Sequence, residues 1–78
     1  MKYFLTNQNE YMDIILNNNK EHFEVENLSV DELLKVKKFT FKMLIVKING
    51  KVVKQPEYYN TYIKDGDNVT VLHLISGG

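Results

Sequence analysis

The chain has 78 residues, enough for one small domain that buries about 60–65% of its unfolded surface, so we expect function at the surface or at an end. Ten lysines balance ten acidic residues without any arginine, which argues against nucleic-acid binding because such binding depends on neutralising phosphates. The absence of cysteine excludes disulfides, cysteine-ligated zinc and a cysteine nucleophile, and no apolar run approaches the roughly 18–20 residues of a membrane span.

The first predicted strands follow a polar start. Residues 1–11 become polar too early for a signal peptide, so we treat them as an N-terminal extension and expect a cytoplasmic protein. Residues 12–16 have a strand-like composition, and residues 17–20 are typical of a tight turn because asparagine tolerates positive φ. Residues 22–26 alternate apolar and acidic side chains, which predicts a second strand and therefore a β-hairpin.

The clearest local signal is the start of a helix. Ser29 and Glu32 have the spacing of a capping box, and Leu28 and Leu33 occupy the positions of a hydrophobic staple. Acidic residues follow the cap and lysines come late, which suits the helix dipole. The pattern predicts a helix of about ten residues, with an apolar stripe made by Val30, Leu33, Leu34 and Val36.

The second half of the chain contains strands separated by tight turns. The predicted order is a strand at 43–48, an Asn-Gly turn at 49–50, an outgoing segment at 51–53, a turn at 65–67 and a last strand at 69–75. Pro56 and the tyrosine-rich stretch after it indicate an irregular crossing segment with one helical turn. We expect Tyr58, Tyr59 and Tyr62 to pack under this segment.

This order of elements predicts an α+β fold. A hairpin, one main helix and two further strands suit a mixed sheet of about four strands packed on the helix. If the first and last strands are central and parallel, the topology is the β-grasp (ubiquitin-like) fold. The domain then covers residues 12–75 and a flexible tail covers residues 76–78.

The sequence stops at Ser76, Gly77 and Gly78, directly after the last predicted strand. Two glycines at a given pair of positions occur by chance in roughly 1 sequence in 200. Without a Cβ, such a tail can thread a narrow enzyme channel, and its last carboxylate is open to attack on ATP. An acyl-adenylate formed there can accept sulfur and become a thiocarboxylate, and this chemistry needs no side chain of the carrier.

The turn motifs and the terminal diglycine are found together in one known family. Residues 46–53 with Asn-Gly-Lys, residues 63–71 with Asp-Gly-Asp and the terminal Gly77-Gly78 resemble the ThiS family of sulfur carriers in thiamine thiazole synthesis. Residues 28–34 also resemble the family's strand-to-helix junction. The likeness runs from about residue 12 to residue 78, and the MoaD carriers of molybdopterin synthesis are related.

The resemblance implies a carrier protein rather than an enzyme, with no bound cofactor. A ThiF-type adenylating enzyme would use Mg-ATP to activate Gly78, and a sulfur donor such as a cysteine desulfurase would supply the sulfur. A ThiG-type thiazole synthase would receive it. Lys54 and Gln55 depart from the Pro-Arg of many members, and residues 72–75 lack the proline common in MoaD-type tails, which favours thiamine.

We expect the last strand to carry a docking surface for the activating enzyme. If the helix covers one face of the sheet, alternation turns Leu72 and Leu74 outward, as it does Ile45 in the preceding strand. An exposed patch of Ile45, Leu72 and Leu74, with His73 at its rim, is therefore the predicted partner interface. The alternative is that the N-terminal extension covers this patch through Phe4 or Leu5.

Other functions stay open at this point. A MoaD-type subunit of molybdopterin synthase and a ubiquitin-like modifier would use the same adenylate, so the tail alone does not separate them. A small S4-like RNA-binding module shares the Asn-Gly-Lys turn. Such a module would be expected to have a basic surface, whereas this chain has a net charge of zero. We expect no metal site, because His22 and His73 lack a carboxylate partner at a recognisable spacing, and neither nucleic acid nor membrane as a partner.

Overall fold

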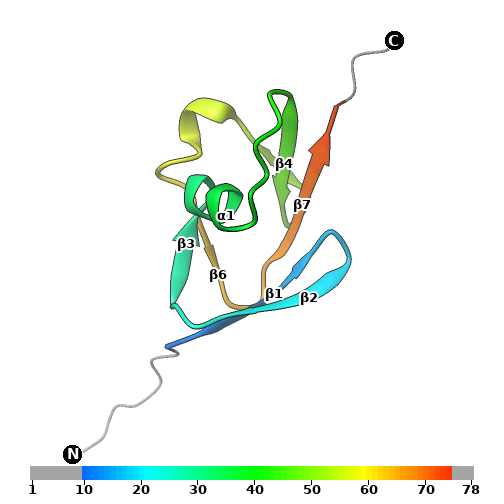
Figure 1. Cartoon of the computed structure of the whole chain (residues 1–78). Coiled ribbons are helices and arrows are strands. Elements are labelled where there is room, and N and C mark those ends of the chain that lie inside the picture. The colour runs from blue at the N-terminus through cyan, green and yellow to red at the C-terminus, as the bar shows by residue number, and fades with distance from the viewer. Residues whose placement is uncertain (1–9, 75–78) are drawn as a thin grey trace, which may run out of the picture.

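The computed structural model describes residues 10–74 and contains a mixed sheet with one helix packed on one of its faces (Figure 1). The five strands of the sheet lie in the order β2-β1-β7-β4-β5, and β3 and β6 form a separate two-stranded sheet. The element bounds are β1 (Met12–Leu16), β2 (Asn19–Phe23), β3 (Asn27–Ser29), α1 (Val30–Val36), β4 (Leu44–Ile48), β5 (Lys51–Val53), the 3-10 turn η2 (Gln55–Glu57), β6 (Tyr62–Lys64) and β7 (Asn68–His73).

Strands β1 and β7 are the central parallel pair that the β-grasp hypothesis requires. Ile15 pairs with Asn68 and Leu16 with Val69, and every other pair in the main sheet is antiparallel. The α+β, β-grasp prediction is therefore confirmed. The main sheet has five strands where about four were expected, and the short β3–β6 pair was not predicted at all.

The first hairpin differs from its prediction in register. Asn17 and Asn18 both have positive φ, 51° and 69°, and form a two-residue turn by themselves. Asn19 therefore already pairs with Leu16, and β2 begins three residues earlier than the predicted strand at 22–26. Val25 lies beyond the strand and is 40% exposed, because the hairpin has ended before it.

The helix begins as predicted and ends early. The Ser29 hydroxyl accepts a hydrogen bond from the Glu32 N–H at 3.0 Å, and the Glu32 carboxylate accepts one from the Ser29 N–H at 2.9 Å, so the capping box is confirmed. The helix has seven residues instead of about ten. Lys38 turns left-handed, with φ of 59°, and the Phe39 N–H bonds back to the Leu34 carbonyl at 2.8 Å. This Schellman-type ending stops the helix, since Lys38 no longer has helical dihedral angles.

The structure buries three of the four apolar residues that were predicted to form the stripe of the helix. Val30, Leu33 and Leu34 are buried against the inner face of the sheet. Val36 is 57% exposed, so its place in the predicted stripe was wrong, because the short helix turns it away from the sheet. The core is completed from the strands by Met12, Ile14, Leu16, Val46, Val53, Ile63, Val69 and Val71.

A hydrogen-bond network joins the two predicted turns. Asn49 and Gly50 both have positive φ, as a type I′ hairpin turn requires. The buried Asp67 carboxylate accepts hydrogen bonds from the Asn49 side chain at 2.9 Å and from the Lys64 N–H at 3.0 Å. The Asn49 side-chain oxygen accepts one from the Asn68 N–H at 2.9 Å. The network therefore fixes the start of β7 against the β4–β5 hairpin.

Candidate functional site

Strand β7 ends at the far side of the molecule from the start of β1 (Figure 1). Within residues 10–74, the backbone contact furthest along this strand is the hydrogen bond from the Leu74 N–H to the Met43 carbonyl, at 2.9 Å. The predicted sulfur-attachment residue Gly78, with Gly77 and Ser76, lies outside the described residues. Gly78 follows Leu74 by four positions, so a fully extended chain places its carboxylate at most about 14 Å away.

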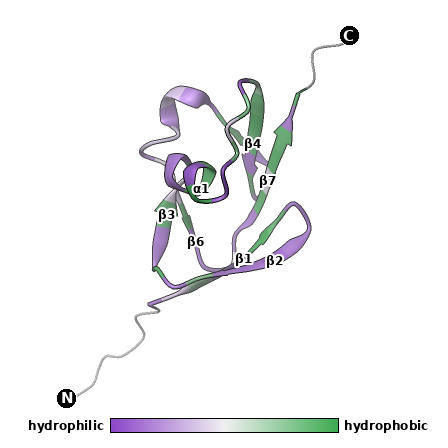
Figure 2. Ribbon diagram, viewed as in Figure 1, coloured by the Kyte–Doolittle hydropathy of each residue, from purple (hydrophilic) through white to green (hydrophobic). Residues whose placement is uncertain are grey.

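The predicted interface residues Ile45, Leu72 and Leu74 are brought together on the face of the sheet opposite α1. Ile45 and Leu72 are direct partners across β4 and β7, and Leu74 continues the alternation of β7. Leu72 is 46% exposed and Leu74 41% exposed, while Ile45 is half-buried. Figure 2 shows that hydrophobic residues run along much of β4 and β7.

Two further exposed apolar residues extend this surface, and sequence reasoning missed both. Val52 is paired with Lys47, which shares the outward face with Ile45, and Met43 is the backbone partner of Leu74. The two-residue Asn-Gly turn sets the hairpin register, so Val52 could have been placed from the sequence. We name Met43, Ile45, Val52, Leu72 and Leu74 the outer patch.

His73 lies on the other face of the sheet. It is paired with the inward-facing Leu44, so its side chain points away from the side that carries Leu72 and Leu74. Its imidazole stacks on the Phe41 ring, with ring centroids 3.9 Å apart and planes 16° from parallel. The structure therefore does not place His73 at the rim of the outer patch.

The alternative cover for the outer patch, residues Phe4 and Leu5 of the extension, lies outside the described residues. The predicted extension covers residues 1–11, of which residues 1–9 also lie outside the described residues. Tyr11 is described, and its ring contacts His22 with ring centroids 5.4 Å apart.

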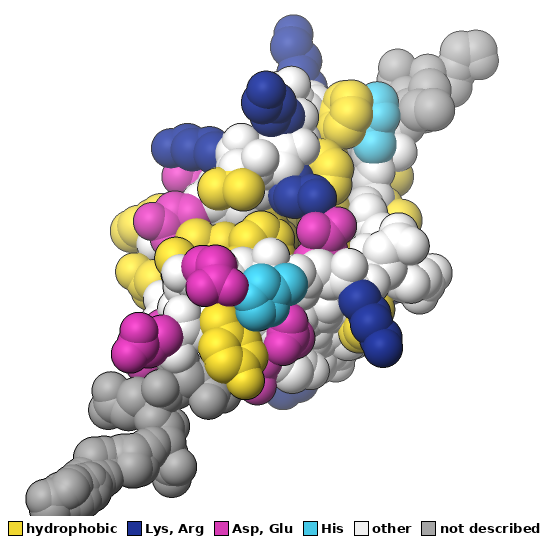
Figure 3. Space-filling model, turned by 60° about the horizontal axis from the view of Figure 1, so that its bottom comes forward, with side chains coloured by type: hydrophobic (Ala, Val, Ile, Leu, Met, Phe, Trp, Pro, Cys, Tyr) yellow, Lys and Arg dark blue, Asp and Glu magenta, His cyan; other side chains and the backbone are white. Residues whose placement is uncertain are grey.

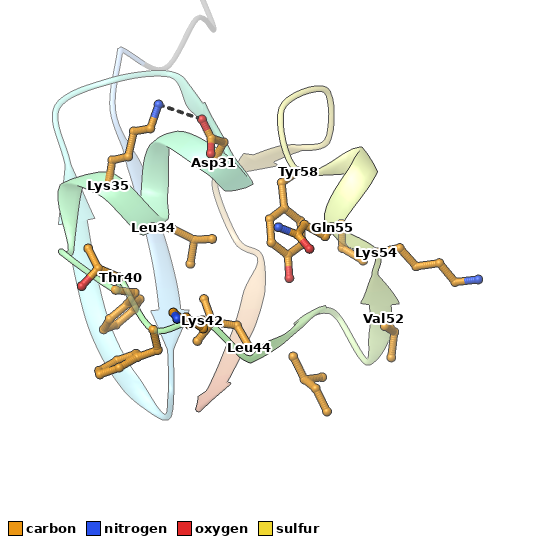
Figure 4. Close-up of a pocket in the computed structure, with 14 residues that line it drawn as sticks. Asp31, Leu34, Lys35, Thr40, Lys42, Leu44, Val52, Lys54, Gln55 and Tyr58 are labelled. Carbon is orange, nitrogen blue, oxygen red and sulfur yellow. Dashed lines mark ion pairs between the residues drawn. The ribbon is translucent and has the colours of Figure 1, made fainter. Parts of the chain in front are cut away.

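A groove of about 440 Å³ lies on the helix side, between α1, the connection that follows it, and the segment from β5 to η2 (Figure 4). Leu34, Leu44 and Tyr58 contribute apolar surface to it. Lys35 is bonded to Asp31 at 3.0 Å, one helical turn away. The groove lining holds no histidine or cysteine.

The tyrosine prediction is confirmed only for Tyr58. Tyr58 packs against the core, and burial raises the pKa of its phenol, so this group stays protonated at neutral pH. Tyr59 is 68% exposed and Tyr62 is 56% exposed. These two do not pack under the crossing segment, because β6 turns Ile63 inward and leaves Tyr62 on its outer side.

His22 lies on the β1–β2 hairpin, between the acidic side chains of Asp13 and Glu24. Figure 3 shows acidic side chains gathered beside a histidine on this face of the molecule. Its Nδ1 lies 2.6 Å from the Asp13 carboxylate, and its Nε2 contacts Glu24. The hydrogen bond to Asp13, followed by that to Glu24, raises the pKa of His22 above 6.5. Within residues 10–74, no three histidine or acidic side chains are grouped to hold a metal ion.

None of the helices in the described part of the chain is long and apolar enough to cross a membrane.

Comparisons with known proteins agree on one relationship. The family model described as the ThiS family matches residues 6–78, a span that holds every element above and the terminal Gly77-Gly78. The chain is also similar to a thiamine biosynthesis protein (ThiS) from Geobacter metallireducens, whose crystal structure aligns with a TM-score of 0.78 and 32% sequence identity. That alignment covers 86% of this chain and 100% of the other.

Proposed function

Because the chain belongs to the ThiS family, we propose that it is a sulfur carrier of thiamine biosynthesis whose working group is the Gly78 carboxylate. The observation that carries the proposal is the family match over residues 6–78, which includes the terminal diglycine beyond a complete β-grasp domain. The family's proteins are small carriers rather than catalysts.

The proposed chemistry takes place at the last carbonyl carbon. A carboxylate oxygen of Gly78 attacks the α-phosphorus of Mg-ATP, and pyrophosphate leaves. The acyl-adenylate then has AMP as its leaving group, so sulfide attacks the carbonyl carbon and displaces it. The product is a thiocarboxylate, which keeps the sulfur as a nucleophile for the next reaction.

The partners are proposed on the same basis. A ThiF-type enzyme would hold Mg-ATP and adenylate Gly78, and a ThiG-type thiazole synthase would receive the sulfur. A donor such as a cysteine desulfurase would provide the sulfur as a persulfide, which displaces AMP to form an acyl disulfide, and a second thiol would then reduce the S–S bond to leave the thiocarboxylate. The carrier would bind no cofactor of its own. The outer patch supports this role, because a cluster of exposed apolar side chains beside the exit of β7 suits docking to a protein partner.

The alternatives are weaker for specific reasons. The structural relative is described as a thiamine biosynthesis protein, which favours a thiamine carrier over a MoaD-type subunit. A ubiquitin-like modifier would share the adenylate but would form an isopeptide bond with a lysine. The S4-like RNA-binding hypothesis has no support from the family match, and the net charge of zero argues against it.

The test is intact-mass spectrometry after incubation with a ThiF-type enzyme, Mg-ATP and sulfide. We expect a mass gain equal to one sulfur in place of one oxygen, and no gain in a variant that lacks Gly78. If the full chain forms neither adenylate nor thiocarboxylate with an enzyme that activates another ThiS protein, the proposal is wrong. A lysine-linked conjugate instead of a thiocarboxylate would establish the modifier.

A further inference from the structure

We propose that the groove between α1 and the segment from β5 to η2 binds a segment of a protein partner in which an apolar side chain is flanked by carboxylates. This site goes beyond the proposed function, because it lies in the folded domain and does not involve the Gly78 carboxylate. The apolar floor of the groove and the lysines around it together define the chemistry of its occupant.

The floor of the groove is apolar. Leu34 and Val53 border the groove and are each 8% exposed. Phe39, Leu44 and Tyr58 also line it, and these half-buried side chains pack against the core. The volume of about 440 Å³ lies within the range of cavities that enclose small ligands, so the groove has room for an apolar side chain of a bound segment.

The rim of the groove is positively charged. Its charged side chains are three lysines, Lys35, Lys42 and Lys54, and one carboxylate, Asp31. Asp31 is bonded to Lys35 at 3.0 Å, and within residues 10–74 no ion pair includes Lys42 or Lys54. Lys54 extends from the side of β5 and η2, whereas Lys42 belongs to the connection between α1 and β4 (Figure 4). Two such cations from different sides of one groove favour an occupant that carries carboxylates.

The occupant is a segment of protein rather than a nucleic acid. A nucleic-acid site would be expected to carry more positive charge, and this chain has a net charge of zero and no arginine. The groove also adjoins the outer patch, because Ile45 and Val52 line both surfaces. A protein that docks on the outer patch can therefore reach the groove with a neighbouring segment.

The experiment begins with a displayed library of random peptides, selected on the full-length chain. We expect the enriched peptides to share an apolar residue flanked by acidic ones. The most enriched peptide is then synthesised with a fluorescent label, and its Kd is measured by fluorescence anisotropy at low and high salt. Binding should weaken as the salt concentration rises, because salt screens the charges at the exposed rim.

Charge reversal tests the rim. Lys42→Glu combined with Lys54→Glu should weaken peptide binding about tenfold or more at low salt, because attraction at both positions becomes repulsion. The matched control is Lys20→Glu combined with Lys64→Glu, which changes the net charge equally but lies outside the groove lining. It should change Kd less than about twofold. All four lysines are exposed, so circular dichroism should show that both double variants are folded.

Phe41→Ala tests the apolar contribution. Phe41 lines the groove, is 46% exposed and is outside the buried cluster, so its removal leaves no buried cavity. We expect it to weaken peptide binding about fivefold. Leu72→Ala changes the outer patch outside the groove lining and should leave Kd unchanged.

Several results would overturn the proposal. One is a selection that enriches no peptide, and another is a peptide that binds the Lys42→Glu, Lys54→Glu variant as tightly as the wild-type chain. Weaker binding in Leu72→Ala alone would place the peptide on the outer patch instead. A labelled single-stranded oligonucleotide that binds more tightly than the peptide would make the groove a nucleic-acid site. A variant that lacks Gly78 should bind the peptide normally, so failure of the proposed sulfur chemistry would leave this inference intact.

Discussion

The single carboxylate of Asp67 accepts hydrogen bonds from two different turns of the chain. It is 7% exposed and accepts hydrogen bonds from the Asn49 side chain and the Lys64 N–H, which lie in different turns. A buried acceptor of this kind satisfies donors that would otherwise lose their hydrogen bonds on folding. The paired turns of the sequence therefore act as one unit in the structure.

We expect Asp67→Ala to lower the free energy of unfolding by about 2–3 kcal/mol, because two donors lose a charged acceptor in a buried site. Urea unfolding at 25 °C measures this. Glu26→Ala, which removes an exposed carboxylate from the loop before β3, is the control and should change stability by less than about 0.5 kcal/mol. Equal effects from both substitutions would show that the network does not stabilise the fold.

His22 gives the fold a dependence on pH. Its pKa is raised above 6.5 chiefly by the hydrogen bond to Asp13, so the folded protein binds the proton more tightly than the unfolded chain. The stabilisation is fully present below pH 6.5 and is lost as the pH rises through the folded pKa.

We therefore expect His22→Gln to lower Tm at a pH below 6.5, and the Tm difference to shrink as the pH rises through the folded pKa of His22. Thermal unfolding across this range measures the difference, and an NMR titration of the imidazole in the wild-type chain gives the pKa directly. The hypothesis is contradicted by a Tm difference that stays constant from pH 5 to pH 9.

The helix is the element whose two ends are determined most locally. Seven residues are too few for a stable isolated helix, so its caps and its packing must hold it. The capping box at Ser29 and the left-handed Lys38 provide the two ends. Lys38 is the weak point, because a residue with a Cβ is strained in the left-handed conformation that glycine adopts freely.

Lys38→Gly should raise the free energy of unfolding by up to about 1 kcal/mol, because relief of this strain exceeds the entropy that glycine adds to the unfolded chain. Lys38→Ala is the matched control, since alanine keeps the Cβ that is strained at a φ of 59° and gains no such relief, so it should be neutral or destabilising. Chemical denaturation of the two variants decides the matter. Destabilisation by Lys38→Gly would argue against the observed helix ending.

Over the whole molecule, the central sheet separates the core from the outer patch. Val69 and Val71 of β7 are buried in the core with residues of α1, and the outward-facing Leu72 belongs to the outer patch. Neighbouring residues of the same strand therefore differ in burial, and this allows a matched pair of substitutions.

Val71→Ala should lower the free energy of unfolding by about 2 kcal/mol, because Val71 is 7% exposed and faces the core. The KM of the activating enzyme for the carrier should stay unchanged. Leu72→Ala should cost less than about 1 kcal/mol and raise KM for the carrier about tenfold, since Leu72 is 46% exposed on the outer patch. Denaturation and ATP–pyrophosphate exchange provide the two measurements. An unchanged KM for Leu72→Ala would exclude this residue from the interface.

The sequence by itself determined the features that depend on neighbours along the chain. The capping box, the Asn-Gly turn and the alternation in β7 follow from dihedral preferences and contacts within a few residues, and the structure bears them out. The diglycine motif and its family resemblance are also properties of the sequence. The predicted boundaries were wrong at the start of β2, which lies three residues earlier than expected, and at the end of α1, which has seven residues instead of about ten.

Only the tertiary structure decided which distant segments meet. The parallel β1–β7 pair joins residues more than 50 positions apart, and the β3–β6 pair depends on three-residue strands that have no signature of their own. The β4–β7 register decides on which side of the sheet His73 lies. The course of the connection between α1 and β4 brings Phe41 into a stack with it. Such contacts are set by how the whole core packs, because no preference along the chain distinguishes one long-range register from another.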